Sequence, residues 1–79
     1  MIYRSHYIIE ISFHARKAAR EKGITFDMFE SAIKNGEIKR FGKNGIKFIS
    51  EYKKGKVVCV GERKHENYIK ILTIEWGCL

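Results

Sequence analysis

The hydrophobic pattern of this chain changes its period once, near residue 37. Between residues 13 and 34 the apolar side chains recur at helical spacing, whereas from residue 37 to 76 they alternate with polar ones, as in strands. A chain of 79 residues forms one domain, because domains average roughly 100 to 150 residues. Two helical segments followed by several strands within residues 1 to 79 predict the α+β class.

Helix start and stop signals divide the first half of the chain. Ser12 and Thr25 are favoured helix N-caps, because their hydroxyl groups accept a hydrogen bond from a free backbone N–H of the first turn. Gly23 stands where a left-handed residue closes a helix. These signals predict helices over about residues 13 to 22 and 26 to 34.

The second half reads as an antiparallel meander that two helices cover on one face. Asn44-Gly45 is the preferred pair for a tight hairpin turn, since both residues tolerate positive φ. The first eleven residues are expected to be extended, with the option of a short edge strand at residues 7 to 12. Alternation in the last segment places Leu72 and Ile74 on one side. The four predicted strands lie near residues 37 to 41, 46 to 53, 56 to 63 and 68 to 76.

Positive charge is concentrated in the predicted sheet. The whole chain carries a formal charge of +7, and residues 34 to 70 hold 11 of its 16 basic side chains against four acidic ones. Lysines interleaved with aromatic residues are typical of a surface that binds phosphates and stacks bases. The alternative is that these lysines only keep strand edges from pairing. The candidate phosphate-binding residues are Lys17, Arg20, Arg40, Lys47 and Lys54.

Several function classes find no support in the sequence. Its apolar runs are far shorter than the roughly 18 residues of a membrane span, and no signal peptide begins the chain, so we expect a cytoplasmic protein with no membrane partner. Cys59 and Cys78 form no C-x-x-C pair, so neither a disulfide framework nor a metal site is expected. No glycine-rich phosphate loop is present, and no cofactor is expected.

Metal-free RNA cleavage requires only a proton-handling group and a cluster of cations. His14 lies in the first turn of the first predicted helix, where a neutral imidazole is favoured and can accept the proton of a ribose 2′-hydroxyl. Tyr52, Thr73 or Glu51 would supply a second proton-handling or orienting group from the sheet. Each also has a structural interpretation, as a core aromatic, an ordinary strand residue and a cross-strand ion-pair partner respectively.

The order of residues resembles the domain-of-unknown-function 4258 family over nearly the whole chain after Ile8. The resemblance implies two amino-terminal helices on a curved antiparallel sheet, related to the RelE-like and barnase-like toxin ribonucleases. The family's histidine falls on His14, whereas its frequent arginine four residues later is Ala18 here. The matching segments are Ile11-Ser12-x-His14-Ala15, Glu21-Lys22-Gly23-Ile24-Thr25, Ala32-Ile33-x-x-Gly36-Glu37-Ile38 and Ile69-Lys70-Ile71-Leu72-Thr73-Ile74-Glu75-Trp76.

The leading hypothesis is therefore a metal-independent endoribonuclease, the toxin of a toxin–antitoxin pair. It would act on messenger or ribosome-bound RNA, and an acidic antitoxin would cover its basic sheet. The main alternative is a non-catalytic basic module that binds nucleic acid or a protein. A third hypothesis is a structural accessory that forms a homodimer through its strand edges.

Overall fold

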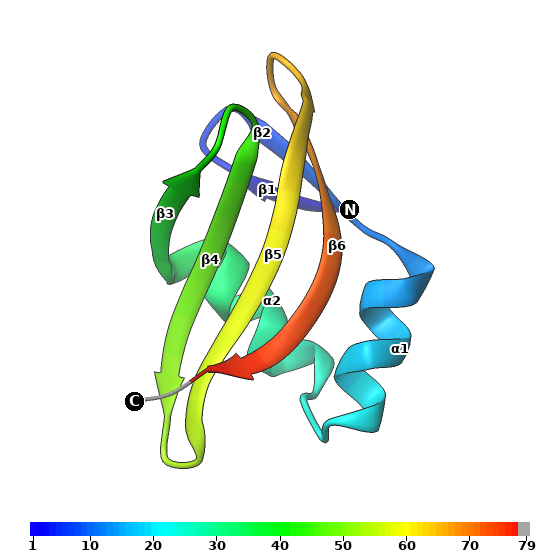
Figure 1. Ribbon diagram of the computed structural model, residues 1–79, viewed down its shortest axis with the longest axis vertical. Coiled ribbons are helices and arrows are strands. Elements are labelled where there is room, and N and C mark those ends of the chain that lie inside the picture. Colours follow the sequence, from blue (N-terminus) through cyan, green and yellow to red (C-terminus); the bar gives the residue numbers. More distant parts are fainter. Residues whose placement is uncertain (78–79) are drawn as a thin grey trace.

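Two helices pack on one face of a six-stranded sheet (Figure 1). The computed structural model describes residues 1–77. The order along the chain is two strands, two helices and four strands. The elements are β1 (Ile2–Arg4), β2 (Tyr7–Ile11), α1 (Phe13–Glu21), α2 (Phe26–Asn35), β3 (Glu37–Phe41), β4 (Gly45–Tyr52), β5 (Gly55–His65) and β6 (Tyr68–Gly77).

The sheet is mixed, and its strand order is β1-β2-β6-β5-β4-β3. The first two strands form a hairpin, and β2 pairs in parallel with β6 through partners such as Ile9 and Ile69. The predicted sheet of about four antiparallel strands preceded by two helices is therefore wrong, because two strands come first and join the sheet. The sequence of the hairpin between β1 and β2 contains no glycine at the turn position that favours one. Ser5 takes a positive φ of 52° there, although serine lacks the conformational freedom of glycine.

The two helices begin and end within a residue of their predicted limits. The Ser12 hydroxyl accepts a hydrogen bond from the Ala15 N–H at 3.0 Å, and the Thr25 hydroxyl accepts one from the Met28 N–H at 3.3 Å. Gly23 takes a φ of 72° directly after α1, as the stop signal predicts. Within residues 1–77 neither helix is long and apolar enough to cross a membrane.

A β-bulge reverses part of the face assignment in β6. Cys59 pairs with Ile74 and Gly61 with Ile71, so β6 carries one more residue than β5 over this stretch. Ile71 and Ile74 therefore both face the helices and are fully buried, although they are three residues apart. Leu72, which simple alternation places beside Ile74, is 40% exposed.

The core lies between the helices and the sheet face that they cover. Phe48 of β4 and Cys59 of β5 are fully buried there, and the Cys59 thiol lies 4.0 Å from the Phe29 carbonyl oxygen of α2. Burial raises the pKa of Cys59 to about 12, because the apolar surroundings disfavour the thiolate. Cys59 is therefore a small core residue and stays protonated at neutral pH.

The sheet curls so that its two ends approach each other on the helix side. Arg4 of β1 donates hydrogen bonds to the carbonyl oxygens of Ile33 at 3.1 Å and Gly36 at 2.8 Å, at the end of α2. Its guanidinium carbon lies 5.9 Å from the centroid of the Phe48 ring. Arg4 thus ties the first hairpin, which passes behind β4 and β5 in Figure 1, to helix and core.

Replacing Arg4 by Met tests this tie. Arg4→Met removes two charge-assisted hydrogen bonds from carbonyl groups at a helix end, so the free energy of unfolding in urea should fall by about 1.5 to 3 kcal/mol. Lys64→Met is the control. Within residues 1–77 Lys64 pairs only with Glu62, at an exposed site, so this substitution should change stability by less than about 1 kcal/mol. Equal effects of the two substitutions would contradict a structural role for Arg4.

Candidate nucleic-acid interface

One row of side chains crosses the sheet on the face opposite the helices. The register pairs Lys39 with Lys47, Lys47 with Val60 and Val60 with Thr73, which joins β3, β4, β5 and β6. We call these four residues the outer row. Because neighbouring strands lie about 4.8 Å apart, the backbones of Lys47 and Thr73 are roughly 10 Å apart, with Val60 between them. Val60 places a small apolar side chain in that interval.

An exposed aromatic ring lies beside the outer row. The Phe41 ring covers Gly45, where an added Cβ would lie 2.4 Å from the ring, so glycine is needed for this close approach. The Lys47 ammonium lies 5.3 Å from the centroid of the same ring, and Phe41 remains 44% exposed. Phe41 thus offers a flat surface for stacking next to a cation.

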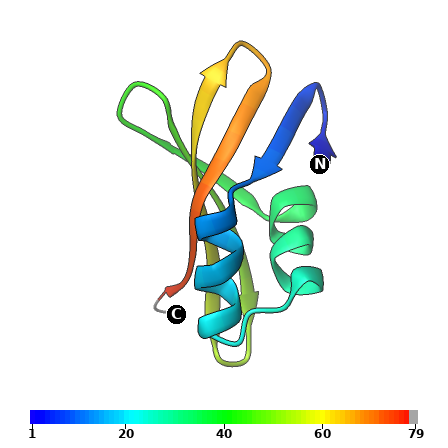
Figure 2. The same cartoon turned by 90° about the vertical axis from the view of Figure 1, so that its right-hand side faces the viewer.

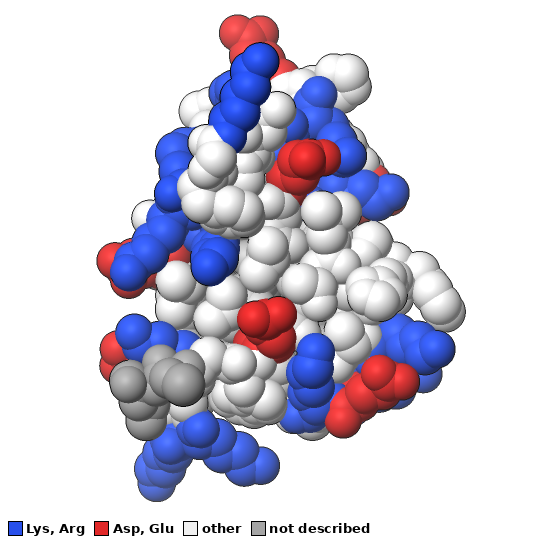
Figure 3. Space-filling model, in the orientation of Figure 1, with Lys and Arg blue, Asp and Glu red and all other residues white. Residues whose placement is uncertain are grey.

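The outer face is hollowed next to this ring. A depression of about 370 Å³ lies between the turn that joins β3 and β4 and the bulge of β6, and its lining includes Phe41, Lys43, Val60 and Leu72. Figure 3 shows this face, with uncharged and acidic side chains in its middle and Lys and Arg side chains along the margin over β3 and β4. Acidic side chains also lie on this face, so the cations form a margin and not a uniform field.

The start of α1 brings His14 to the edge of this face. The pairing of β2 with β6 ends at Ile11 and Ile71, and the Ser12 N–H donates to the Ile71 carbonyl oxygen at 3.1 Å. From there α1 replaces β2 beside β6, and the two elements run side by side (Figures 1 and 2). At the far end of α1, the Trp76 indole donates to the Lys22 carbonyl oxygen at 2.8 Å.

His14 and Thr73 lie near each other on two adjacent elements that run in the same direction. Each is two residues beyond the hydrogen bond between Ser12 and Ile71. Because a helix rises about 1.5 Å per residue and a strand about 3.3 Å, Thr73 lies roughly 4 Å further along this direction than His14. His14 is exposed, and helical geometry places it about 160° around α1 from Arg16, on the flank turned away from α2. His14 and Thr73, two candidates chosen from the sequence, therefore both lie at one edge of the outer face.

The other two candidate catalytic residues lie elsewhere. Tyr52 faces the helices, and its hydroxyl donates to the Met28 carbonyl oxygen at 3.2 Å, so it has a structural partner. Glu51 points to the outer face but pairs with Lys56, near the opposite end of β4. It lies two strands across and four residues along from Thr73, which is roughly 16 Å away between backbones.

The candidate phosphate-binding residues fall into separate regions, and only Lys47 belongs to the outer row. Lys17 and Arg20 are exposed on α1, and Lys54 lies in the turn between β4 and β5. Arg40 is on the other side of β3, where its guanidinium donates to the Tyr7 hydroxyl at 3.1 Å. Lys39 is not one of these five candidates. The predicted two-residue turn at Asn44-Gly45 would pair Lys39 with Ser50. The turn in the structure lies at residues 42 to 44, with Gly42 at a φ of 58°, and it pairs Lys39 with Lys47.

Within residues 1–77, no three side chains of His, Cys, Asp or Glu come together in a way that would hold a metal ion. The described thiol, Cys59, is buried in the core. Comparison with known proteins adds no assignment, since no family model, no curated protein and no solved structure matches the chain. What the outer row does must therefore be inferred from its own residues.

Lys47 should contribute more to RNA binding than a lysine outside the outer row. Lys47→Ala removes a cation beside Phe41, so the Kd for a single-stranded 12-nucleotide RNA should rise about three- to tenfold, and the slope of log K against log salt should fall by roughly 0.7. Lys54→Ala makes the same charge change in a distant turn and should alter the Kd less than twofold. Fluorescence anisotropy at several salt concentrations measures both. Equal losses would show that only net charge matters.

Proposed function

We propose that this chain is a metal-independent endoribonuclease that binds single-stranded RNA across the outer row. The observation that carries the proposal is that α1 holds His14 beside β6, at the end of the outer row that Thr73 forms. A proton acceptor, a hydroxyl group and a cation are the groups that cleavage by the ribose 2′-hydroxyl requires.

Each group has a defined step in this reaction. The His14 imidazole takes the proton of the 2′-hydroxyl, and the 2′ oxygen forms a bond to the adjacent phosphorus. The Lys47 ammonium stabilises the negative charge that develops on the phosphate oxygens, and the Thr73 hydroxyl donates a hydrogen bond to one of them. The bond from phosphorus to the 5′ oxygen breaks, and that oxygen takes a proton from solvent at the open surface. The products end in a 2′,3′-cyclic phosphate and a 5′-hydroxyl.

Phe41 and the depression next to it would hold the nucleotide that flanks the scissile phosphate. An exposed ring with a lysine at its edge stacks a base without sequence preference. Val60 and Leu72 supply an apolar floor on which the base can rest. Positioning by stacking is needed here because the outer row is open and offers few groups to orient the substrate.

The cellular role that we propose follows from the resemblance described for the sequence. A small ribonuclease related to the domain-of-unknown-function 4258 family and to RelE-like toxins would act in the cytoplasm on messenger or ribosome-bound RNA. An acidic antitoxin that covers the outer face would block the outer row by charge complementarity. A neighbouring gene for a short acidic or DNA-binding protein would support this role.

The second candidate function is RNA binding without cleavage. Two observations favour it: the Tyr52 hydroxyl donates to the Met28 carbonyl oxygen, and Glu51 lies far from Thr73. Of the candidate catalytic residues, this leaves only His14 as a strong proton acceptor near the outer row. The same outer row would then bind phosphates, and His14 would be an ordinary residue at a helix start.

Cleavage of labelled RNA in EDTA separates the two functions. The wild type should give fragments with 2′,3′-cyclic phosphate ends, and His14→Ala should lower the rate at least 100-fold, the usual contribution of a general base. His65→Ala is the matched control, since His65 is an exposed histidine at the end of β5, and it should retain the wild-type rate. No cleavage of free RNA, with or without ribosomes, would reject the nuclease and favour the binding module.

A further inference from the structure

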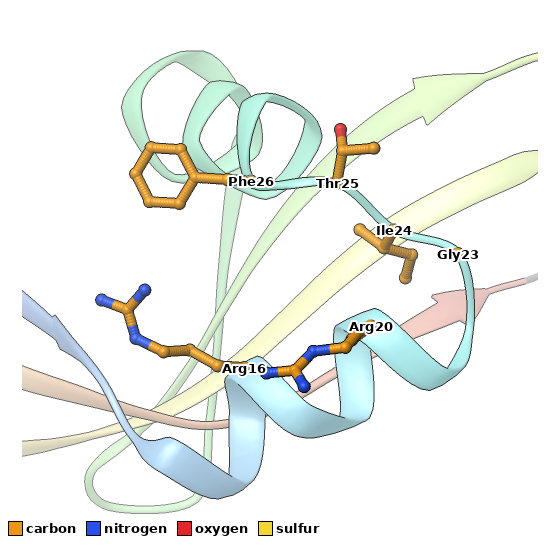
Figure 4. A pocket seen from close by; sticks show the side chains of 6 residues that line it. All are labelled: Arg16, Arg20, Gly23, Ile24, Thr25 and Phe26. Carbon is orange, nitrogen blue, oxygen red and sulfur yellow. The ribbon is translucent and has the colours of Figure 1, made fainter.

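A second pocket lies on the helix side of the molecule, between α1 and the start of α2 (Figure 4). Its volume is about 330 Å³. It is separate from the outer row, because it opens on the flank of α1 opposite His14. We call this pocket the interhelical cleft. Its lining residues are Arg16, Arg20, Gly23, Ile24, Thr25 and Phe26.

Two arginines of α1 give the interhelical cleft its charge. Arg16 and Arg20 are one helical turn apart, so both side chains extend from the same flank of α1 along the space that Phe26 borders from α2 (Figure 4). Both residues are exposed. Within residues 1–77 neither guanidinium forms a salt bridge, and the cleft lining contains no carboxylate. The Cβ atoms of two residues one helical turn apart lie about 6 Å apart, so the two arginines can reach two carboxylates at a similar spacing.

The remainder of the cleft is apolar. Ile24 is buried and closes the floor, whereas Phe26 is 46% exposed at the rim. On α1, Phe13 is 77% exposed one turn before Arg16. Arginine and aromatic side chains are enriched at protein interfaces, where lysine is depleted, whereas the cations of the outer row are lysines. The two surfaces thus differ in the residue types that they present.

We propose that the interhelical cleft binds an acidic segment of a partner protein. Two carboxylates one helical turn apart on that segment would pair with Arg16 and Arg20. A large apolar side chain next to them would pack on Ile24 and Phe26. This inference does not rest on the ribonuclease proposal, because it uses neither His14 nor the outer row.

The charges around the cleft favour a short peptide segment over RNA. Asp27 and Glu30 are on α2, next to the cleft but outside its lining. An extended polyanion that continues along α2 meets these carboxylates, and its phosphates are repelled there. A peptide segment ends before it reaches them, and its own side chains can complement them.

Selection from a displayed library of random 16-residue peptides tests the proposal with the full chain. The enriched peptides should share two acidic residues three or four positions apart and one large apolar residue. Fluorescence anisotropy with a labelled consensus peptide then measures the Kd. The variant with both Arg16→Ala and Arg20→Ala should bind at least tenfold more weakly. The variant with both Lys53→Ala and Lys54→Ala loses the same charge at a distant turn and should bind within threefold of the wild type.

Reversing the charges guards against a folding defect. The variant with both Arg16→Glu and Arg20→Glu should no longer bind the consensus peptide. It should instead bind a peptide in which lysines replace the acidic residues of the consensus. Three outcomes would overturn the proposal: no enrichment of acidic peptides, equal losses in the two alanine double variants, or a larger loss of single-stranded RNA affinity in the arginine variant than in the lysine variant. The last result would assign the cleft to RNA.

Discussion

The parallel pairing of β2 with β6 is the interaction on which the rest of this structure depends. It ends at Ile11 and Ile71, and the next hydrogen bond, from Ser12 to Ile71, turns the chain from strand into helix. Because β2 stops there, α1 occupies the place beside β6 that a longer strand would have taken. One pairing therefore closes the core and puts His14 next to the outer face. It also turns Arg16 and Arg20 toward α2.

The sequence predicts the elements that local chemistry defines and misses those that distant contacts define. Ser12, Thr25 and Gly23 act within a single turn, so both helices were predicted within a residue of their ends. Ile9 and Ile69 are 60 positions apart, and nothing near either residue indicates their pairing. The same limit applies to the candidate site. His14, Thr73 and Lys47 were chosen by residue type. Alternation with Phe48 along β4 turns Tyr52 inward, but the hydrogen bond from its hydroxyl to Met28 depends on how α2 packs on the sheet. The bulge that exposes Leu72 is likewise set by strand pairing and not by alternation.

Two surfaces with different residue types border α1 on its opposite flanks. The outer face presents lysines, an exposed phenylalanine and an apolar floor, which suits a flexible polyanion whose phosphates need only long-range attraction. The interhelical cleft presents two guanidinium groups and an apolar floor, which suits carboxylates held at fixed geometry. Since α1 contributes to both, a partner in the cleft and RNA on the outer face would contact opposite flanks of one short helix. A chain of this size thus has room for a substrate and a partner at separate sites.

The central claim is that RNA lies across the outer row beside His14. Titration of the ¹⁵N-labelled protein with a 2′-O-methyl oligonucleotide, which cannot be cleaved through its 2′ position, tests this claim by nuclear magnetic resonance. The largest amide shifts should occur at Lys47, Val60 and Thr73, together with His14 at the start of α1. Shifts confined to the interhelical cleft, or to the turn that carries Lys53 and Lys54, would contradict the claim.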